Sequence, residues 1–202
     1  MSQITSVPVK IRRVALRNPL DVPIQAVAGR FGEKAREVER FLKFAIVGMI
    51  GAVIDFGTLF ILQATVLAPV DPNKDLRVAV ASSIAFVAAV TSNFFWNRYW
   101  TYPDSRSKPI LRQFGMFFVL SVVGLLIRTP IFAFFSGPMV ALVETMQYGV
   151  FAGLIDFAVN TLHISVEQLG LNLALVIAVL VVLFWNFFSN RFITYSDVKF
   201  GK

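Results

Sequence analysis

Two ionisable residues lie deep inside apolar stretches of this 202-residue sequence, where a charged side chain is energetically costly. Asp55 and Arg128 each stand about fifteen residues into an apolar run, and each follows a Gly-x-x-Ile segment, at Gly51 and Gly124. A charge at that depth in a membrane costs roughly 2.5 kcal/mol or more, so both side chains should face the protein interior. We predict that Asp55 and Arg128 face each other or share a polar cavity. The alternative is an ion pair that only fixes the register of the helices.

A ten-residue polar and aromatic motif occurs twice. Residues 93–102 read NFFWNRYWTY and residues 186–195 read NFFSNRFITY, which are identical at seven of ten positions. The Asn-x-x-x-Asn-Arg pattern places two amides on one helix face, with a guanidinium just beyond them. Donors of this kind at lipid-headgroup depth can bind a phosphate, and Arg can bind it bidentately. Brought together, the two copies would form one donor-rich site. The candidate phosphate ligands are Asn93, Asn97, Arg98, Asn186, Asn190 and Arg191.

A structural role for the twin motif stays open. Asn side chains can form hydrogen bonds to a neighbouring helix, and Arg98 and Arg191 can anchor the chain at the cytoplasmic interface. The aromatic residues of the motif can form a belt at the same interface. These aromatic residues are Trp96, Tyr99, Trp100, Tyr102 and Tyr195.

Other polar and glycine patterns indicate no chemistry. Asp156, Asn160, His163 and Glu167 recur at helical spacing as one continuous polar face, and a lone His without Cys is a poor zinc site. The glycines of the first apolar run lack the spacing of a phosphate loop and are typical of close helix packing. We see no nucleophile with a base. The sequence therefore predicts no catalytic residue, no metal and no cofactor, and the chain is not expected to be an enzyme.

The composition indicates an integral membrane protein, with 56% hydrophobic and 15% charged residues against roughly 25% charged in soluble domains. We predict an all-α bundle of four transmembrane helices, built as two parallel two-helix repeats. The expected spans are residues 41–67, 76–97, 110–135 and 169–188, within a domain at 40–197. Residues 1–39 form a tail with an amphipathic surface helix from Phe31, and residues 136–168 form an outer interfacial or re-entrant segment.

The distribution of basic residues sets the orientation. Residues 1–43 hold nine Lys or Arg residues, whereas residues 129–190 hold none. Both termini are therefore expected in the cytoplasm, in a multi-pass protein of the cell membrane surrounded by membrane lipids. A homodimer is expected because four helices enclose little space, and the stripe Ala81, Ala85 and Ala89 is available for its packing.

The segments Phe41-Leu42-Lys43-Phe44, Val47-Gly48 and Asp55-Phe56, together with both motif copies, resemble the GtrA-like family of small four-span membrane proteins. Tyr102 and Tyr195 depart from the usual Phe at the motif end. The resemblance implies a flippase-like role, in which a polyprenyl-phosphate-linked monosaccharide moves to the outer leaflet for cell-surface polysaccharide synthesis. A membrane glycosyltransferase would be the partner, and no nucleic acid is involved. The motif residues would receive the lipid phosphate, and Asp55 with Arg128 would line the path of the sugar.

Two other functions stay open. A non-transporting adaptor would recruit or stabilise a polyprenyl-phosphate glycosyltransferase, through the basic segment at 31–43. A proton-coupled exporter of the small multidrug type would also have four spans and one buried carboxylate, Asp55. That function is disfavoured because Arg128 would hold Asp55 ionised, and because it gives the twin motif no role.

Overall fold

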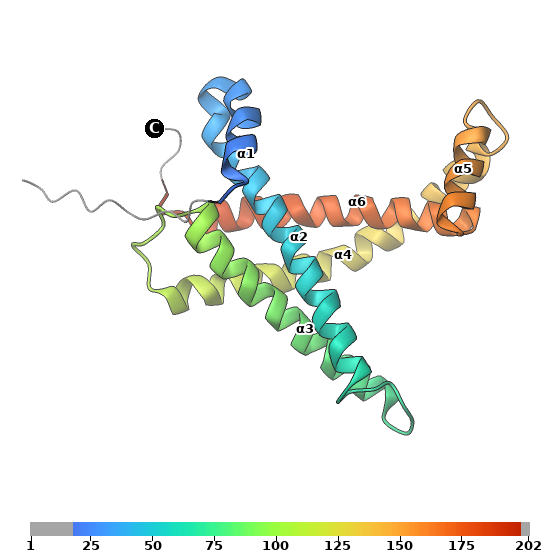
Figure 1. Cartoon of the computed structure of the whole chain (residues 1–202), viewed down its shortest axis with the longest axis horizontal. Coiled ribbons are helices and arrows are strands. Elements are labelled where there is room, and N and C mark those ends of the chain that lie inside the picture. The colour runs from blue at the N-terminus through green and yellow to red at the C-terminus, as the bar shows by residue number, and fades with distance from the viewer. Residues whose placement is uncertain (1–17, 199–202) are drawn as a thin grey trace, which may run out of the picture. The chain divides into compact units, whose positions relative to one another are not determined.

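The computed structural model describes residues 18–198, which form helices and loops without strands (Figure 1). The part of the predicted tail at residues 1–17 lies outside this range. The chain divides into two compact units. The first unit holds the described residues up to Pro109 with Asp197 and Val198, and the second unit is Ile110–Ser196. The α-helices are α1 (Asp21–Ala28), α2 (Ala35–Ala64), α3 (Lys74–Trp96), α4 (Ile110–Met146), α5 (Ala152–Leu162) and α6 (Val166–Ser189).

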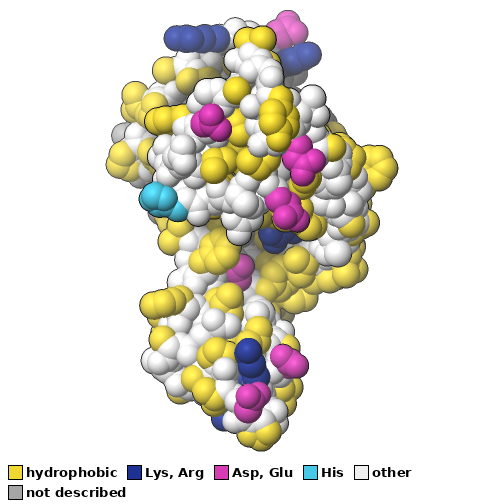
Figure 2. Space-filling model, turned by 90° about the vertical axis from the view of Figure 1, so that its right-hand side faces the viewer, with side chains coloured by type: hydrophobic (Ala, Val, Ile, Leu, Met, Phe, Trp, Pro, Cys, Tyr) yellow, Lys and Arg dark blue, Asp and Glu magenta, His cyan; other side chains and the backbone are white. Residues whose placement is uncertain are grey.

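Four helical segments of the described chain are long and apolar enough to cross a membrane. They contain α2, α3, α4 and α6, and many of their large apolar side chains are exposed. Figure 2 shows apolar side chains spread over one face of the molecule. An apolar surface of this extent suits contact with lipid tails rather than water. The predicted all-α class with four membrane-crossing helices is confirmed.

In the first unit α3 packs against α2 through small residues. Ala81, Ala85 and Ala89 are all buried, and the same helix face continues to Asn93, whose amide lies against Gly51 of α2. Small side chains allow the backbones to approach closely, which is how helices associate in lipid. The prediction that this alanine stripe is available to a second copy is therefore wrong, because the stripe is used inside the unit. A dimer itself stays a prediction.

In the second unit α4 and α6 pack in the same manner. Gly170, Ala174 and Ala178 are buried along α6, and a Cβ added to Gly170 would lie 2.5 Å from the Cα of Val140. Further along, the amide of Asn186 lies against Gly124, as that of Asn93 lies against Gly51. Equivalent glycines and asparagines of the two sequence repeats thus meet in each unit. A pseudo-two-fold axis between the units stays a prediction.

The N-terminal part of the described chain differs from the expected tail. Residues 21–28 of the predicted tail form helix α1, which precedes the expected amphipathic helix, and α1 packs against α2. The amphipathic helix expected from Phe31 is interrupted, because Gly32 has a φ of 56° and the long helix begins only at Ala35. Glycine adopts this backbone conformation readily, whereas other residues do not. The single glycine therefore separates a short helix from the first membrane helix.

Residues 136–168 also differ from the expected segment. Helix α4 continues past Phe135 to Met146 and includes Pro130 and Pro138, which membrane helices tolerate. A separate short helix, α5, then ends at Leu162, and His163 adopts a left-handed conformation with a φ of 52°. The four polar residues predicted on one continuous helix face therefore do not share a helix. Asp156 and Asn160 lie in α5, whereas Glu167 lies in the first turn of α6.

We predict that Gly170→Ala destabilises the second unit. The new Cβ would meet backbone atoms of Val140 and Met139, which a side-chain rotation leaves in place. Overpacking of this kind costs about 1–3 kcal/mol. Thermal unfolding in detergent should show a lower Tm. Gly137→Ala is the matched control, because nothing lies within 4 Å of its added Cβ and Ala favours the helix. An equal Tm for both variants would contradict the close packing.

We predict that Gly51→Ala is destabilising only while Asn93 is present. The added Cβ would lie 2.3 Å from Nδ2 of Asn93, so the amide must leave its place. In an Asn93→Ala background the obstacle is gone, and the same substitution should be neutral or stabilising. A double-mutant cycle of Tm values measures this coupling. Gly48→Ala, with nothing within 4 Å of its Cβ, is the control on the same helix. Additive effects of the two substitutions would disprove the contact.

Candidate functional site

The first motif copy changes the winding of the chain at the end of α3. After Trp96 the residues Asn97–Thr101 form a π-helical turn, in which the amide of Tyr102 donates to the carbonyl oxygen of Asn97 at 2.7 Å. Single π turns in α-helices are rare and occur frequently at functional sites. The wider turn rotates the residues after Asn97 relative to a regular helix.

The second motif copy adopts the same turn at the end of α6. Residues Asn190–Thr194 form a π-helical turn, and the amide of Tyr195 donates to the carbonyl oxygen of Asn190 at 2.8 Å. The side-chain amide of Asn190 donates to the Asn186 carbonyl at 2.8 Å and accepts from the Thr194 hydroxyl at 2.8 Å. Within its own unit this copy therefore satisfies both polar atoms of the Asn190 side chain.

The second asparagine and the arginine of each copy are buried, whereas the first asparagines, Asn93 and Asn186, are half-buried. Asn97 and Arg98 are 1% and 7% exposed, and Asn190 and Arg191 are 0% and 2% exposed. Arg191 donates to the Tyr195 carbonyl at 3.4 Å. Predicted site residues thus lie inside the protein at the end of each even-numbered span rather than on its surface. The joining of the two copies into one site stays a prediction.

The first copy has several buried polar atoms without a hydrogen-bond partner in residues 18–198. They include Nε and Nη1 of Arg98 and the hydroxyl of Thr101, besides the Oδ1 atoms of Asn93 and Asn97. A buried donor without an acceptor costs about 1–3 kcal/mol, and more when it is charged. The Arg98 guanidinium therefore offers two donors to a group that residues 18–198 do not supply, and an anion would satisfy both.

A second guanidinium lies beside the first motif copy. Arg106 donates to the backbone carbonyl of Arg98 at 2.9 Å, and its guanidinium carbon stands 5.0 Å from the centre of the Tyr99 ring. This cation–π contact holds the charge close to the motif. The sequence showed Arg106 only as one of several basic loop residues, and nothing in its spacing indicated this contact.

An ion-pair network surrounds the same end of the first unit. The Lys43 ammonium lies 2.9 Å from Asp21 and 2.7 Å from Glu39, and it stands 5.5 Å from the centre of the Trp100 ring. The Trp100 indole donates to Asp21 at 2.8 Å. Helix α1 is thereby tied to the first motif copy. The network borders a pocket of about 240 Å³ between α2 and the loop after the π turn.

Asp197 is held in the first unit by hydroxyl and amide donors. Its carboxylate accepts from the Ser105 hydroxyl at 2.5 Å and from the Ser107 hydroxyl at 2.7 Å. Partial burial raises the pKa of Asp197, but the hydrogen bonds from Ser105 and Ser107 together outweigh it and hold that pKa below the usual value. The carboxylate is therefore charged at neutral pH and fixes the loop that follows the first motif copy.

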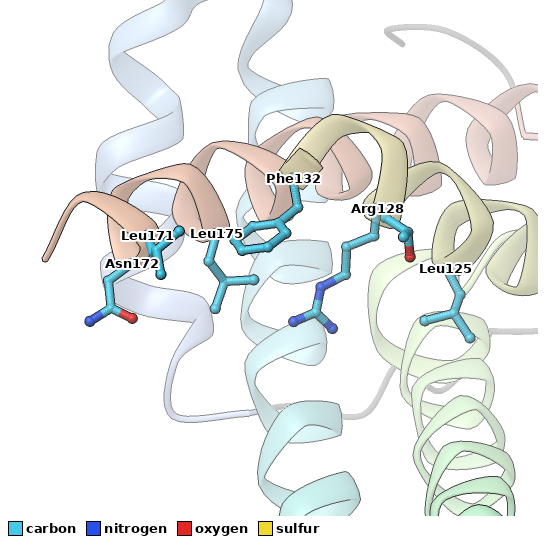
Figure 3. A pocket seen from close by; sticks show the side chains of 7 residues that line it. Leu125, Arg128, Phe132, Leu171, Asn172 and Leu175 are labelled. Atoms are coloured by element: carbon cyan, nitrogen blue, oxygen red, sulfur yellow. The ribbon is translucent and has the colours of Figure 1, made fainter. Parts of the chain in front are cut away.

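Asp55 and Arg128 belong to different units, so their predicted pairing stays a prediction. Asp55 is half-buried in α2, and Arg128 is exposed on α4. Arg128 borders a pocket of about 330 Å³ within the second unit (Figure 3). The other lining residues come from α4 and α6 and are Leu125, Thr129, Phe132, Leu171, Asn172 and Leu175.

The comparisons with known proteins point to one family. Residues 43–143, half of the chain, match the family described as GtrA/DPMS, transmembrane domain. The match includes α3 with the first motif copy and ends within α4, so the second copy lies outside it.

A curated protein also shows similarity to part of the chain. It is the dolichol-phosphate mannosyltransferase of Pyrococcus furiosus, 27% identical over 92 residues. The alignment covers 46% of this chain but only 24% of that protein. Four membrane-crossing helices and the family match agree with each other. The chain is a multi-pass membrane protein and belongs to the GtrA/DPMS transmembrane domain family.

Proposed function

We propose that this protein moves a polyprenyl-phosphate-linked monosaccharide across the cytoplasmic membrane, for cell-surface polysaccharide synthesis or glycosylation. The observation that carries this proposal is the buried guanidinium of Arg98, whose Nε and Nη1 have no hydrogen-bond partner in residues 18–198 and would both be satisfied by an anion. The family match supports a lipid phosphate as that anion. The name of the Pyrococcus furiosus relative, dolichol-phosphate mannosyltransferase, also refers to a lipid phosphate. The chain forms and breaks no covalent bond in this role.

The first motif copy is the primary phosphate site in this proposal. Arg98 offers two donors in a fixed fork, which matches two oxygens of a phosphate. The side chains of Asn93 and Asn97 lie on the same helix face and contribute amide donors. Asn186, Asn190 and Arg191 supply the equivalent groups in the second unit, where more of them are already bonded.

In this proposal the motif site lies at the inner leaflet. Basic residues gather near the motif end of the helices, and none occurs in residues 129–190. Both termini are then cytoplasmic. A membrane glycosyltransferase would make the lipid-linked sugar on that side, and Asp55 and Arg128 would line the path of the sugar. A homodimer would widen the enclosed space.

An adaptor function is the second candidate, and the comparison with the archaeal enzyme favours it. The alignment covers 24% of that mannosyltransferase, so most of that protein lies outside it. A separate chain of the same family could hold a glycosyltransferase at the membrane without transport. The ion-pair network around Lys43 and Asp21, on the predicted cytoplasmic side, would offer the docking face.

We predict that Arg98→Gln lowers the affinity for undecaprenyl phosphate about tenfold or more, because charge-assisted hydrogen bonds contribute about 1.5–3 kcal/mol. Arg191→Gln should have a smaller effect, since Arg191 already donates to the Tyr195 carbonyl. Native mass spectrometry of the purified protein measures both. Arg112→Gln, which removes an exposed charge from α4, is the control.

Two outcomes would change the proposal. Equal affinities of the wild type and Arg98→Gln would remove the phosphate role of the motif. A protein that carries no lipid but co-purifies with a glycosyltransferase, and loses it when Asp21 and Lys43 are replaced by alanine, would favour the adaptor.

We predict that Asp55→Arg and Arg128→Asp each lower the yield of inserted protein and its Tm, because each leaves two like charges within the membrane. The double variant should recover part of both losses if the side chains pair. Yield in isolated membranes and thermal unfolding in detergent are the measurements. Losses that add in the double variant would show that the two residues have separate roles.

A further inference from the structure

The pocket beside Arg128 combines one charge, two neutral polar groups and an apolar wall. Arg128 and Thr129 come from α4, and Asn172 comes from α6. In Figure 3 the Arg128 side chain extends from its helix on the same side as Phe132 and Leu175, and its guanidinium lies below them. A pocket of about 330 Å³ is large enough for a phosphate and the start of an acyl or isoprenoid chain.

The position of this pocket along the helices separates it from the second motif copy. Gln113 of α4 lies beside Thr194, since its side-chain amide donates to the Thr194 carbonyl at 3.5 Å. Arg128 is fifteen residues further along α4, or about 22 Å in a helix. Asn172 precedes Asn190 by eighteen residues, or about 27 Å. In a hydrocarbon core of about 30 Å, the pocket thus lies in the half away from the motif.

A guanidinium at this depth requires an anionic partner. No described carboxylate of the second unit forms a salt bridge with Arg128. Its guanidinium has five donors, so it can bind a phosphate even if a carboxylate occupies part of it. The hydroxyl of Thr129 and the amide of Asn172 are the other polar groups of the pocket lining, and Figure 3 shows Leu175 and Phe132 between the Asn172 amide and the guanidinium. Leu125, Phe132 and Leu175 offer an apolar wall to the lipid chain.

We propose that the pocket of Arg128, Thr129 and Asn172 is a second lipid-phosphate site, in the outer half of the membrane. Its placement in the outer half and its polyprenyl ligand rest on the proposed function. The phosphate of a phospholipid has the same chemistry, so the experiment must separate the two lipids. A lipid phosphate would then have one binding site near each boundary of the membrane.

Native mass spectrometry with undecaprenyl phosphate tests this proposal by stoichiometry. We expect two lipids per wild-type chain, one per chain in Arg128→Gln and one in Arg98→Gln, with none in the double variant. Arg112→Gln, which removes another charge from α4, should retain two. Undecaprenol, which lacks the phosphate, should bind to neither site. Competition with phosphatidylglycerol identifies the source, because a polyprenyl site should keep undecaprenyl phosphate against a tenfold excess.

The outcomes distinguish this site from the motif site. Two lipids in Arg128→Gln and one in Arg98→Gln would overturn the pocket and leave the motif site intact. One lipid in Arg128→Gln and two in Arg98→Gln would support the pocket and overturn the motif site. If Arg128→Gln does not insert, the Thr129→Val, Asn172→Leu variant removes the two neutral donors and should weaken the second binding step at least threefold. An unchanged second step in that variant would overturn the pocket.

Discussion

Close approach of helix backbones at small residues is the constraint on which the structure depends. Lipid gives apolar helices no hydrophobic reason to associate, so they must gain packing contacts that only small side chains allow. Gly170 meets the backbone of Val140, and Gly51 and Gly124 leave the space that an asparagine amide fills in each unit. The depth and direction of the first asparagine in each motif copy are therefore set by helix packing, before any ligand is considered.

The arrangement of the other polar side chains of each motif copy follows from the placement of its first asparagine. Because the first asparagine is fixed against a glycine, the chain has only a few residues in which to turn its remaining donors inward. The π-helical turns at Asn97–Thr101 and Asn190–Thr194 achieve this in both units, and they bury Arg98 and Arg191. The result differs between the copies, since Thr194 bonds to Asn190 whereas Thr101 has a buried hydroxyl without a partner.

The sequence was sufficient to predict the features that repeat or persist over many residues. Four apolar runs gave the membrane-crossing helices, and two similar motifs gave the polar groups at their ends. Features that depend on a single residue or on distant contacts were missed. Gly32 separates α1 from α2, and Asp21 reaches Lys43 and Trp100 across many residues. The alanine stripe was assigned to the wrong partner, because small-residue spacing predicts close packing without saying which helix provides the other side.

Arg98 and Arg128 differ in burial, and burial affects how tightly a carrier would hold a phosphate. Arg98 is almost fully buried with unsatisfied donors, whereas Arg128 is exposed in an open, mostly apolar pocket. A carrier must bind its ligand well enough to admit it and weakly enough to release it, as pores with several sites do. A deep guanidinium would capture the phosphate strongly. An exposed guanidinium would hold it less tightly, so release of the phosphate from Arg98 would be the more costly step for a carrier.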